Sequence, residues 1–116
     1  MTTKELNYLS SKKIGRLATI SKTGQPHVVP VMYSLQGNER IVVSGTGFDK
    51  SYKFKNVQSN PKIAFVVDSV KLSPWTPMGI ELRGEAKIID VGSGLIGIEI
   101  IPFKKASWGI NEDGVE

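Results

Sequence analysis

The fold is decided by Arg16-Leu17-Ala18-Thr19-Ile20, which leads through the polar turn Lys22-Thr23-Gly24-Gln25 into a mostly apolar run over residues 27–35. Two such runs around a glycine-containing turn predict a β-hairpin. The turn Gln36-Gly37-Asn38 and the strand Arg40-Ile41-Val42-Val43-Ser44 follow at once. Three consecutive strands joined by short loops predict an antiparallel meander.

Two short helices are predicted beside these strands. Thr2 and Glu5 form a capping-box pattern ahead of apolar residues, and this first helix is expected to end near Gly15. The second helix is expected over residues 51–57, and Asn60-Pro61 ends it. Both helices are small compared with the predicted strands.

The second half of the chain adds further strands. Ile63-Ala64-Phe65-Val66-Val67-Asp68 suits a buried strand, and Ile80-Glu81-Leu82-Arg83-Gly84-Glu85-Ala86 alternates like a strand with one wet face. Residues 87–90 and 95–101 predict a last hairpin, whereas the proline-containing segment 72–79 is expected to be a loop. The chain is therefore predicted to be mainly β with small helices, as a six- to seven-stranded antiparallel barrel.

Length and composition fit a single domain over residues 1–116. No apolar run reaches the length of a membrane span, and the N-terminus lacks the apolar region of a signal peptide, which predicts a cytoplasmic protein. The absence of Cys and the single His27 argue against disulfides, thiol catalysis and a metal site. The 15 basic and 11 acidic residues give a formal charge of +4, which suits either an anionic ligand or nucleic acid.

The segment Ser51-Tyr52-Lys53-Phe54-Lys55 predicts an anion-binding site. It follows a glycine-flanked strand end, Ser44-Gly45-Thr46-Gly47, and Asp49 or Ser51 can cap the helix that it opens. Backbone N–H groups at a helix start can hold a phosphate while Lys53 neutralises its charge. The alternative, a solvated charged face of a helix, stays open at this point.

No side chain is nominated as catalytic. Residues 92–97 have the spacing G-x-G-x-x-G, but a dinucleotide fingerprint must open a helix, and the residues here favour a strand. His27 has no Ser or Asp partner in the sequence and is interpreted as a strand-face residue. Trp75, between two prolines, fits either a binding surface or a plug at a barrel end.

Seven blocks of the sequence occur in an informative order and spacing. They are residues 15–20, 23–26, 28–33, 53–58, 60–68, 74–75 and 80–86. Together they resemble the pyridoxamine 5'-phosphate oxidase-like family. The closing Ser107-Trp108-Gly109-Ile110 is similar to the end of the branch that depends on the deazaflavin coenzyme F-420.

This resemblance implies a split β-barrel of the FMN-binding type, as a homodimer with two clefts, each formed by both chains and each holding FMN or coenzyme F-420. The implied cofactor-binding residues form a phosphate side, a ring-supporting strand and a contribution from the second chain. They are Ser44, Gly45, Thr46, Ser51, Tyr52, Lys53 and Lys55; Val28, Val29, Pro30, Val31 and Met32; and Trp75, Met78 and Gly79. Pro30 removes one N–H group from its strand, which frees neighbouring backbone groups for ring heteroatoms.

The phosphate block departs from the family pattern. Related sequences usually have Ser-Arg-Lys-Phe-Arg, whereas this chain has Ser51-Tyr52-Lys53-Phe54-Lys55, so the bidentate guanidinium contacts are lost and Lys53 acts as a point charge. The leading hypothesis is an oxidoreductase that transfers a hydride between the cofactor and a small organic substrate. The alternatives are a flavin-binding or storage protein without turnover and, less favoured, a small nucleic-acid-binding barrel.

Overall fold

The computed structural model describes residues 1–37 and 39–110; Asn38, the last residue of one predicted turn, lies outside the described residues. In chain order the elements are α1 (Thr3–Ser11), β1 (Ile14–Ile20), β2 (Pro26–Gln36), β3 (Arg40–Ser44), the 3-10 turn η1 (Phe48–Lys50), α2 (Tyr52–Ser59), β4 (Lys62–Leu72), β5 (Trp75–Asp90) and β6 (Ile96–Trp108). No helix among these residues has the length and apolar character needed to cross a membrane.

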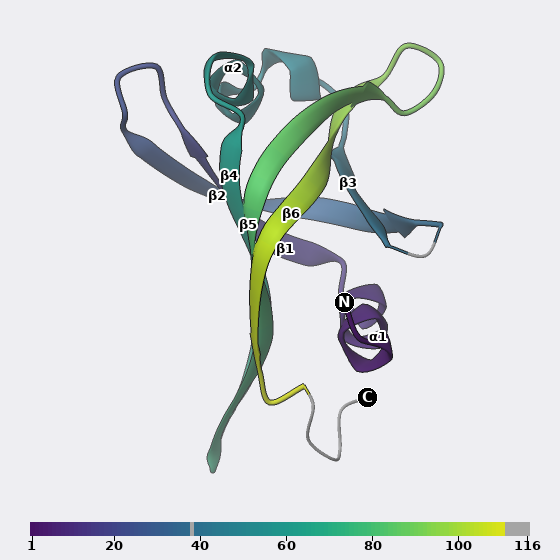
Figure 1. The fold of residues 1–116 in the computed structure, drawn as a ribbon, viewed down its shortest axis with the longest axis vertical. Coiled ribbons are helices and arrows are strands. Elements are labelled where there is room, and N and C mark those ends of the chain that lie inside the picture. The colour runs from purple at the N-terminus through teal and green to yellow at the C-terminus, as the bar shows by residue number, and fades with distance from the viewer. Residues whose placement is uncertain (38, 111–116) are drawn as a thin grey trace.

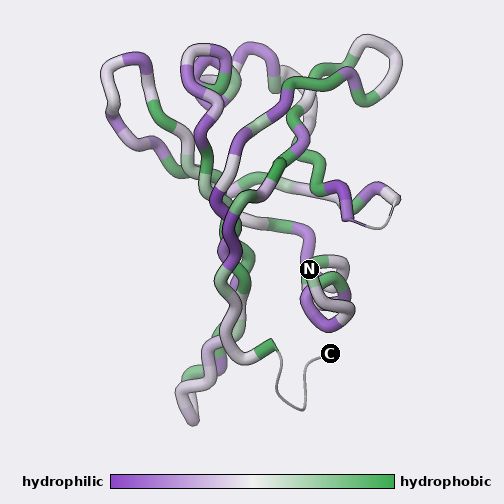
Figure 2. Tube along the Cα trace, viewed as in Figure 1, coloured by the Kyte–Doolittle hydropathy of each residue, from purple (hydrophilic) through white to green (hydrophobic). Residues whose placement is uncertain are grey.

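The strands form one closed barrel in the order β1-β2-β3-β6-β5-β4 (Figure 1), and every neighbouring pair is antiparallel. This confirms the predicted mainly β fold, the six-stranded antiparallel barrel and the meander of β1, β2 and β3. Hydrophobic and hydrophilic residues alternate along much of the barrel (Figure 2), as expected for strands with one buried face.

The prediction that segment 72–79 is a loop is wrong. Leu72 pairs with Trp75 across a turn that contains a cis Ser73–Pro74 peptide bond, so β4 and β5 continue beyond the barrel as a two-stranded arm (Figure 1). The pairing of β5 with β6 begins only at Gly79, which leaves Pro77 with β4 as its one neighbouring strand. Proline has no backbone N–H group, and it is tolerated there because no second neighbouring strand needs a hydrogen bond from this residue.

Both predicted helices are present. The capping box of α1 is confirmed by the Thr2 hydroxyl accepting from the Glu5 N–H at 3.1 Å and the Glu5 carboxylate accepting from the Thr2 N–H at 2.8 Å. This helix ends at Ser11 rather than near Gly15, because Ile14 already pairs with Met32 of β2. The cap of α2 is Ser51, not Asp49.

The two faces of the sheet differ in what covers them. Inward-facing residues of all strands pack with α1 and α2 in one core, around Leu17, Phe65 and Leu82. On the outer face, Ile14 pairs with Met32 and Ala18 with Val28, and paired residues point to the same side of a sheet. The exposed outer side chains include Ile14, Val28, Met32 and, along the arm, Val70, Leu72 and Trp75. These exposed apolar side chains share the outer face with the exposed charged residues Arg16 and Asp68, and the described residues leave them uncovered.

Candidate functional site

The start of α2, where the sequence predicts an anion-binding site, is a capped helix start that follows a glycine turn. Gly47 adopts a left-handed conformation with φ of 73°, which turns the chain from the end of β3 into η1. The Ser51 hydroxyl then accepts from the Phe54 N–H at 3.3 Å and donates to the Phe48 carbonyl at 2.6 Å. The first N–H groups of α2 have no acceptor within the helix, as at any helix start, and they carry its positive dipole end.

Aromatic rings hold two ammonium groups at this helix start. The Lys53 Nζ lies 5.3 Å from the centre of the Phe48 ring, and the Lys55 Nζ lies 5.6 Å from that of Tyr52. Phe48 is itself buried and packs edge-on against Phe54. Within the described ranges, neither lysine forms an ion pair with a carboxylate. The predicted anion site therefore has positive charge that protein groups there do not neutralise.

The first half of β2 has an open backbone edge. β2 pairs with β1 over residues 26–32, whereas β3 pairs with β2 only over residues 33–36. The Tyr33 N–H donates to the Lys13 carbonyl at 3.1 Å, so odd-numbered residues direct their backbone groups toward β1 and even-numbered ones away from it. The backbone groups of Val28, Pro30 and Met32 therefore face the open edge.

The structure brings most of the predicted site residues into two adjoining groups. The loop from Ser44 to Thr46 leads into η1, where the Phe48 N–H donates to the Gly45 carbonyl at 3.1 Å. The Ser51 N–H donates in turn to the Phe48 carbonyl at 3.1 Å, which links this loop to the start of α2. The ring of His27 on β2 lies 6.3 Å from that of Tyr52, so the part of β2 that contains Val28, the next residue along the chain, lies near this helix start. The predicted phosphate side and ring side are therefore neighbours.

Two predicted strand residues face the other way. Val31 is buried in the core and Val29 packs partly against it. Both are odd-numbered, so their side chains point inward and their backbone groups point toward β1. Of the five predicted residues on this strand, Val28, Pro30 and Met32 offer side chains on the outer face and backbone groups on the open edge.

The arm residues do not join this site within one chain. Trp75, Met78 and Gly79 lie on the β4–β5 arm, which extends away from α2 in Figure 1. A Cβ atom on Gly79 would lie 2.6 Å from the Trp108 ring, so the glycine makes room for that ring. Their approach to a cofactor bound by a second chain stays a prediction.

A polar cluster beneath α2 was not foreseen from the sequence. Asn56 and Thr19, both buried, are joined by a hydrogen bond of 2.9 Å, and His27 pairs with Thr19 across the strands. The His27 Nδ1 atom is buried without a hydrogen-bond partner. A groove of about 650 Å³ between α2 and the β1–β2 turn, lined by Lys22 and Lys55 among others, lies next to this cluster. Only the strand register, which the sequence does not give, brings these groups together.

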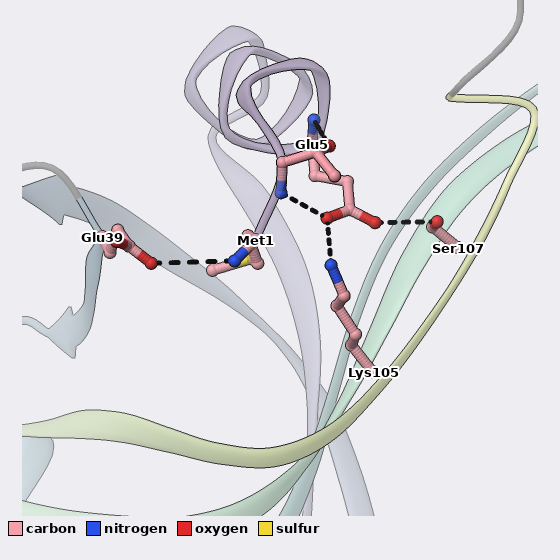
Figure 3. Close-up of polar contacts among 6 residues, drawn as sticks. Met1, Glu5, Glu39, Lys105 and Ser107 are labelled. Atoms are coloured by element: carbon pink, nitrogen blue, oxygen red, sulfur yellow. Dashed lines mark hydrogen bonds and ion pairs between the residues drawn. The ribbon is translucent and has the colours of Figure 1, made fainter.

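Glu5 anchors α1 to the last strand (Figure 3). Its carboxylate accepts from the Lys105 ammonium at 2.6 Å, the Ser107 hydroxyl at 2.9 Å and the Thr2 N–H at 2.8 Å. Burial by itself would raise the pKa of Glu5, but the hydrogen bonds from Lys105, Thr2 and Ser107 outweigh it and lower the pKa from 4.5 to about 2. The sequence showed the capping role of Glu5 but not this ion pair.

Comparison with known proteins identifies the family. Residues 1–94 match the family described as Pyridoxamine 5'-phosphate oxidase. The 5a,11a-dehydrotetracycline/5a,11a-dehydrooxytetracycline reductase of Streptomyces rimosus is 36% identical, over 97% of this chain and 85% of its own. The chain belongs to the pyridoxamine 5'-phosphate oxidase-like family. The resemblance seen in the sequence is thereby confirmed.

Solved structures show how widely the fold of this family is shared. A conserved hypothetical protein from Mycobacterium tuberculosis has a TM-score of 0.79 at 21% identity, covering 93% of this chain and 84% of its own. A protein described as an F-420 reductase has a TM-score of 0.71 at 18% identity, covering 91% and 98%. An FAD-binding protein from Mycobacterium smegmatis has a TM-score of 0.68 at 16% identity, covering 93% of each chain. The split-barrel fold of the family is therefore the fold of this chain.

Proposed function

We propose that this protein is an oxidoreductase that binds coenzyme F-420 or FMN and transfers a hydride between it and a small organic substrate. The observation that carries the proposal is the adjacency of two complementary surfaces. The ammonium groups of Lys53 and Lys55 lie at the start of α2, and the open edge of β2 includes Val28, next to His27, whose ring lies 6.3 Å from that of Tyr52. A phosphate-bearing cofactor with a planar, hydrogen-bonding ring needs both.

The phosphate side of the proposed site combines three kinds of group. Backbone N–H groups at the start of α2 and the flexible backbone of Gly45 would contact phosphate oxygens. The hydroxyl groups of Ser44, Thr46, Ser51 and Tyr52 would add hydrogen bonds, and Lys53 and Lys55 would balance the charge. Because both cations are ammonium groups rather than guanidinium groups, they act as point charges without fixed bidentate geometry.

The ring side would use the open edge of β2. The N–H groups of Val28 and Met32 and the carbonyls of Val28, Pro30 and Met32 are available to ring heteroatoms, because β3 does not pair with this half of the strand. The bound cofactor, once reduced, supplies the hydride. The protein's own contribution is to bind the phosphate, orient the ring and exclude water. Dehydrotetracycline reductase activity in the relative named above supports an organic acceptor.

We further propose that the protein is a homodimer whose cofactor sites lie at the interface. The apolar outer face of β1, β2, β4 and the arm is what a second copy would cover, since large exposed apolar surfaces mark interaction sites. In such a dimer, the partner subunit's Trp75, the partner subunit's Met78 and the partner subunit's Gly79 would approach the ring. Whichever cofactor binds, coenzyme F-420 or FMN, would occupy this cleft between the two subunits.

The proposal is tested by titrating the protein with FMN and with coenzyme F-420, following ring absorbance and fluorescence. Saturable binding of one of them is expected. Lys53→Ala should raise its Kd by tens of fold, on the scale of about 2 kcal/mol for a hydrogen bond to a charged group. Turnover is then measured with the bound cofactor and a panel of small organic acceptors.

The control is Lys87→Ala, which removes an exposed lysine from β5, away from the start of α2, whereas Lys53 is half-buried. It should leave the Kd unchanged. An unchanged Kd in Lys53→Ala would contradict the phosphate assignment, and binding of neither cofactor would contradict the function. Tight binding with no turnover of any acceptor would instead support a flavin-storage role.

A further inference from the structure

We propose that the pocket between α1 and β2 is a substrate subsite that takes a small apolar molecule bearing an anionic group. The interpretation of this pocket as a substrate site rests on the proposed function. The pocket has a volume of about 300 Å³. Its lining is Leu9, Ser10, Lys12, Lys13, Met32, Tyr33, Ser34 and Leu35.

The lining combines an apolar wall with two ammonium groups. Leu9, Met32 and Leu35 present hydrocarbon, while Lys12 and Lys13 follow directly after the end of α1. Across the residues that the structure describes, neither lysine forms an ion pair with a carboxylate. Such a pocket is complementary to a ligand with an apolar body and one negative group, because the ligand's charge meets unneutralised ammonium groups while its body excludes water.

The position of the pocket ties it to the proposed cofactor site. Met32 is the last residue of β2 before the strand begins to pair with β3, so it ends the open edge. The same residue lines the pocket and is two-thirds exposed. A molecule in the pocket would therefore lie next to a ring bound along the open edge, with its charged group directed toward Lys12 and Lys13.

The wall that carries the lysines is held in place at both ends of α1. At its first turn, Glu5 is bound by Lys105 and Ser107 of β6 (Figure 3). At its last turn, the Tyr33 hydroxyl donates to the Leu9 carbonyl at 2.5 Å, and the Lys12 Nζ lies 5.4 Å from the centre of the Tyr8 ring. A fixed helix end gives the pocket a defined distance between its cations and its apolar wall, as charge selection requires.

The first test needs no cofactor. The chain has 3 methionines, so the Met32 methyl group can be followed by NMR during titration with naphthalenesulfonate and with the neutral compound naphthol. Naphthalenesulfonate should shift the Met32 resonance with a Kd several-fold below that of naphthol. In Lys12→Gln/Lys13→Gln the Kd for naphthalenesulfonate should rise by about three- to tenfold, as expected for the loss of two solvent-accessible charge contacts, with little change for naphthol.

The control is Lys4→Gln, which removes a lysine from α1 outside the pocket lining. It should leave both affinities unchanged. If the two ligands bind equally in the wild type, or if the double variant weakens both to the same extent, the proposed subsite is wrong. Absence of any Met32 shift with either ligand would also overturn it.

The second test uses turnover with the bound, reduced cofactor. Lawsone, a hydroxynaphthoquinone that is an anion near neutral pH, is compared with menadione, which is neutral. The double variant should raise KM for lawsone by about three- to tenfold and leave kcat and the KM for menadione unchanged. Equal effects on both quinones would contradict the subsite. If the wild type binds neither cofactor, the proposed function is wrong instead. The NMR titration would still decide whether the pocket is an anion-selective subsite.

Discussion

Glu5 is the residue through which the first helix is joined to the last strand. Its carboxylate is almost fully buried, yet it accepts three hydrogen bonds, one of them from the half-exposed ammonium of Lys105. A buried carboxylate without these donors would be protonated or displaced. The low pKa of Glu5 is therefore a measure of how strongly the folded state prefers the charged form.

We expect Glu5→Gln to remove a pH-dependent part of the stability. The pKa of Glu5 is about 2 in the folded protein and near 4.5 when unfolded, so the unfolded state binds the proton more readily. The contribution is fully present above about pH 5 and is lost as the pH falls toward about 2, with a size of about 2–3 kcal/mol. Denaturant unfolding across this range should show a steeper loss of stability in the wild type than in the variant.

Glu39→Gln is the control for this measurement. Glu39 lies 3.8 Å from the amino group of Met1 but is mostly exposed, so the variant should keep the wild-type pH profile. Identical slopes for wild type and Glu5→Gln would show that the Glu5 ion pair does not stabilise the fold.

At the scale of elements, the pairing of β5 with β6 depends on a glycine. The register shifts between Arg83 and Gly84, where Phe103 is the extra residue on β6. A Cβ atom on Gly84 would lie 1.9 Å from the Ile101 carbonyl oxygen, which is backbone and cannot rotate away. Gly84→Ala should therefore destabilise the protein by about 2–3 kcal/mol, because the strands must separate locally.

Chemical denaturation measures this effect, with Arg83→Ala as the control on the preceding residue. Arg83 is exposed, and its ion pair with Glu81 is near the surface, so the control should change stability by less than about 1 kcal/mol. A Gly84→Ala variant as stable as the control would mean that the strands accommodate the methyl group, contrary to the close contact in the structure.

The sequence predicts elements whose signals are local. The caps Thr2 and Ser51 and the glycine-containing turn of the first hairpin were all recognisable, because each acts over a few residues. The arm was not, since Pro74 and Pro77 have the composition of a loop. Pro74 lies in the turn, and the strand conformation of Pro77 depends on pairing with β4, which local propensity does not show.

The candidate site could likewise be predicted only where its signals are local in the sequence. Lys53 and its neighbours form one continuous segment, and their shared position at a helix start follows from the capping pattern. The open edge of β2 and the pocket at Lys12 and Lys13 could not be predicted, because both depend on where β3 stops pairing and where α1 packs. Contacts between distant segments require the register of the whole barrel.

At the scale of the whole molecule, the distribution of apolar side chains is uneven. The core fills the barrel, yet Ile14, Val28 and Met32 remain at least half exposed on one outer face, and Leu72 and Trp75 extend it along the arm. Several exposed apolar side chains on one face are unfavourable in water unless another surface covers them. A second copy of the chain provides the same face, so a two-fold arrangement can cover both at once.

We therefore expect the protein to be a dimer in sedimentation velocity, and Ile14→Lys to convert it to a folded monomer. Ile14 is half exposed at the outer face, so a lysine there costs the monomer little but would bury an ammonium group in the interface of the proposed dimer. The matched control is Ile88→Lys, which replaces a similarly exposed isoleucine whose strand partner, Ile98, belongs to the core. Because the second copy would complete the cofactor cleft, the Ile14 variant should also lose affinity for the cofactor, whereas the control should keep both dimer and affinity. A monomeric wild type, or dissociation of both variants alike, would show that the outer face is not the dimer interface.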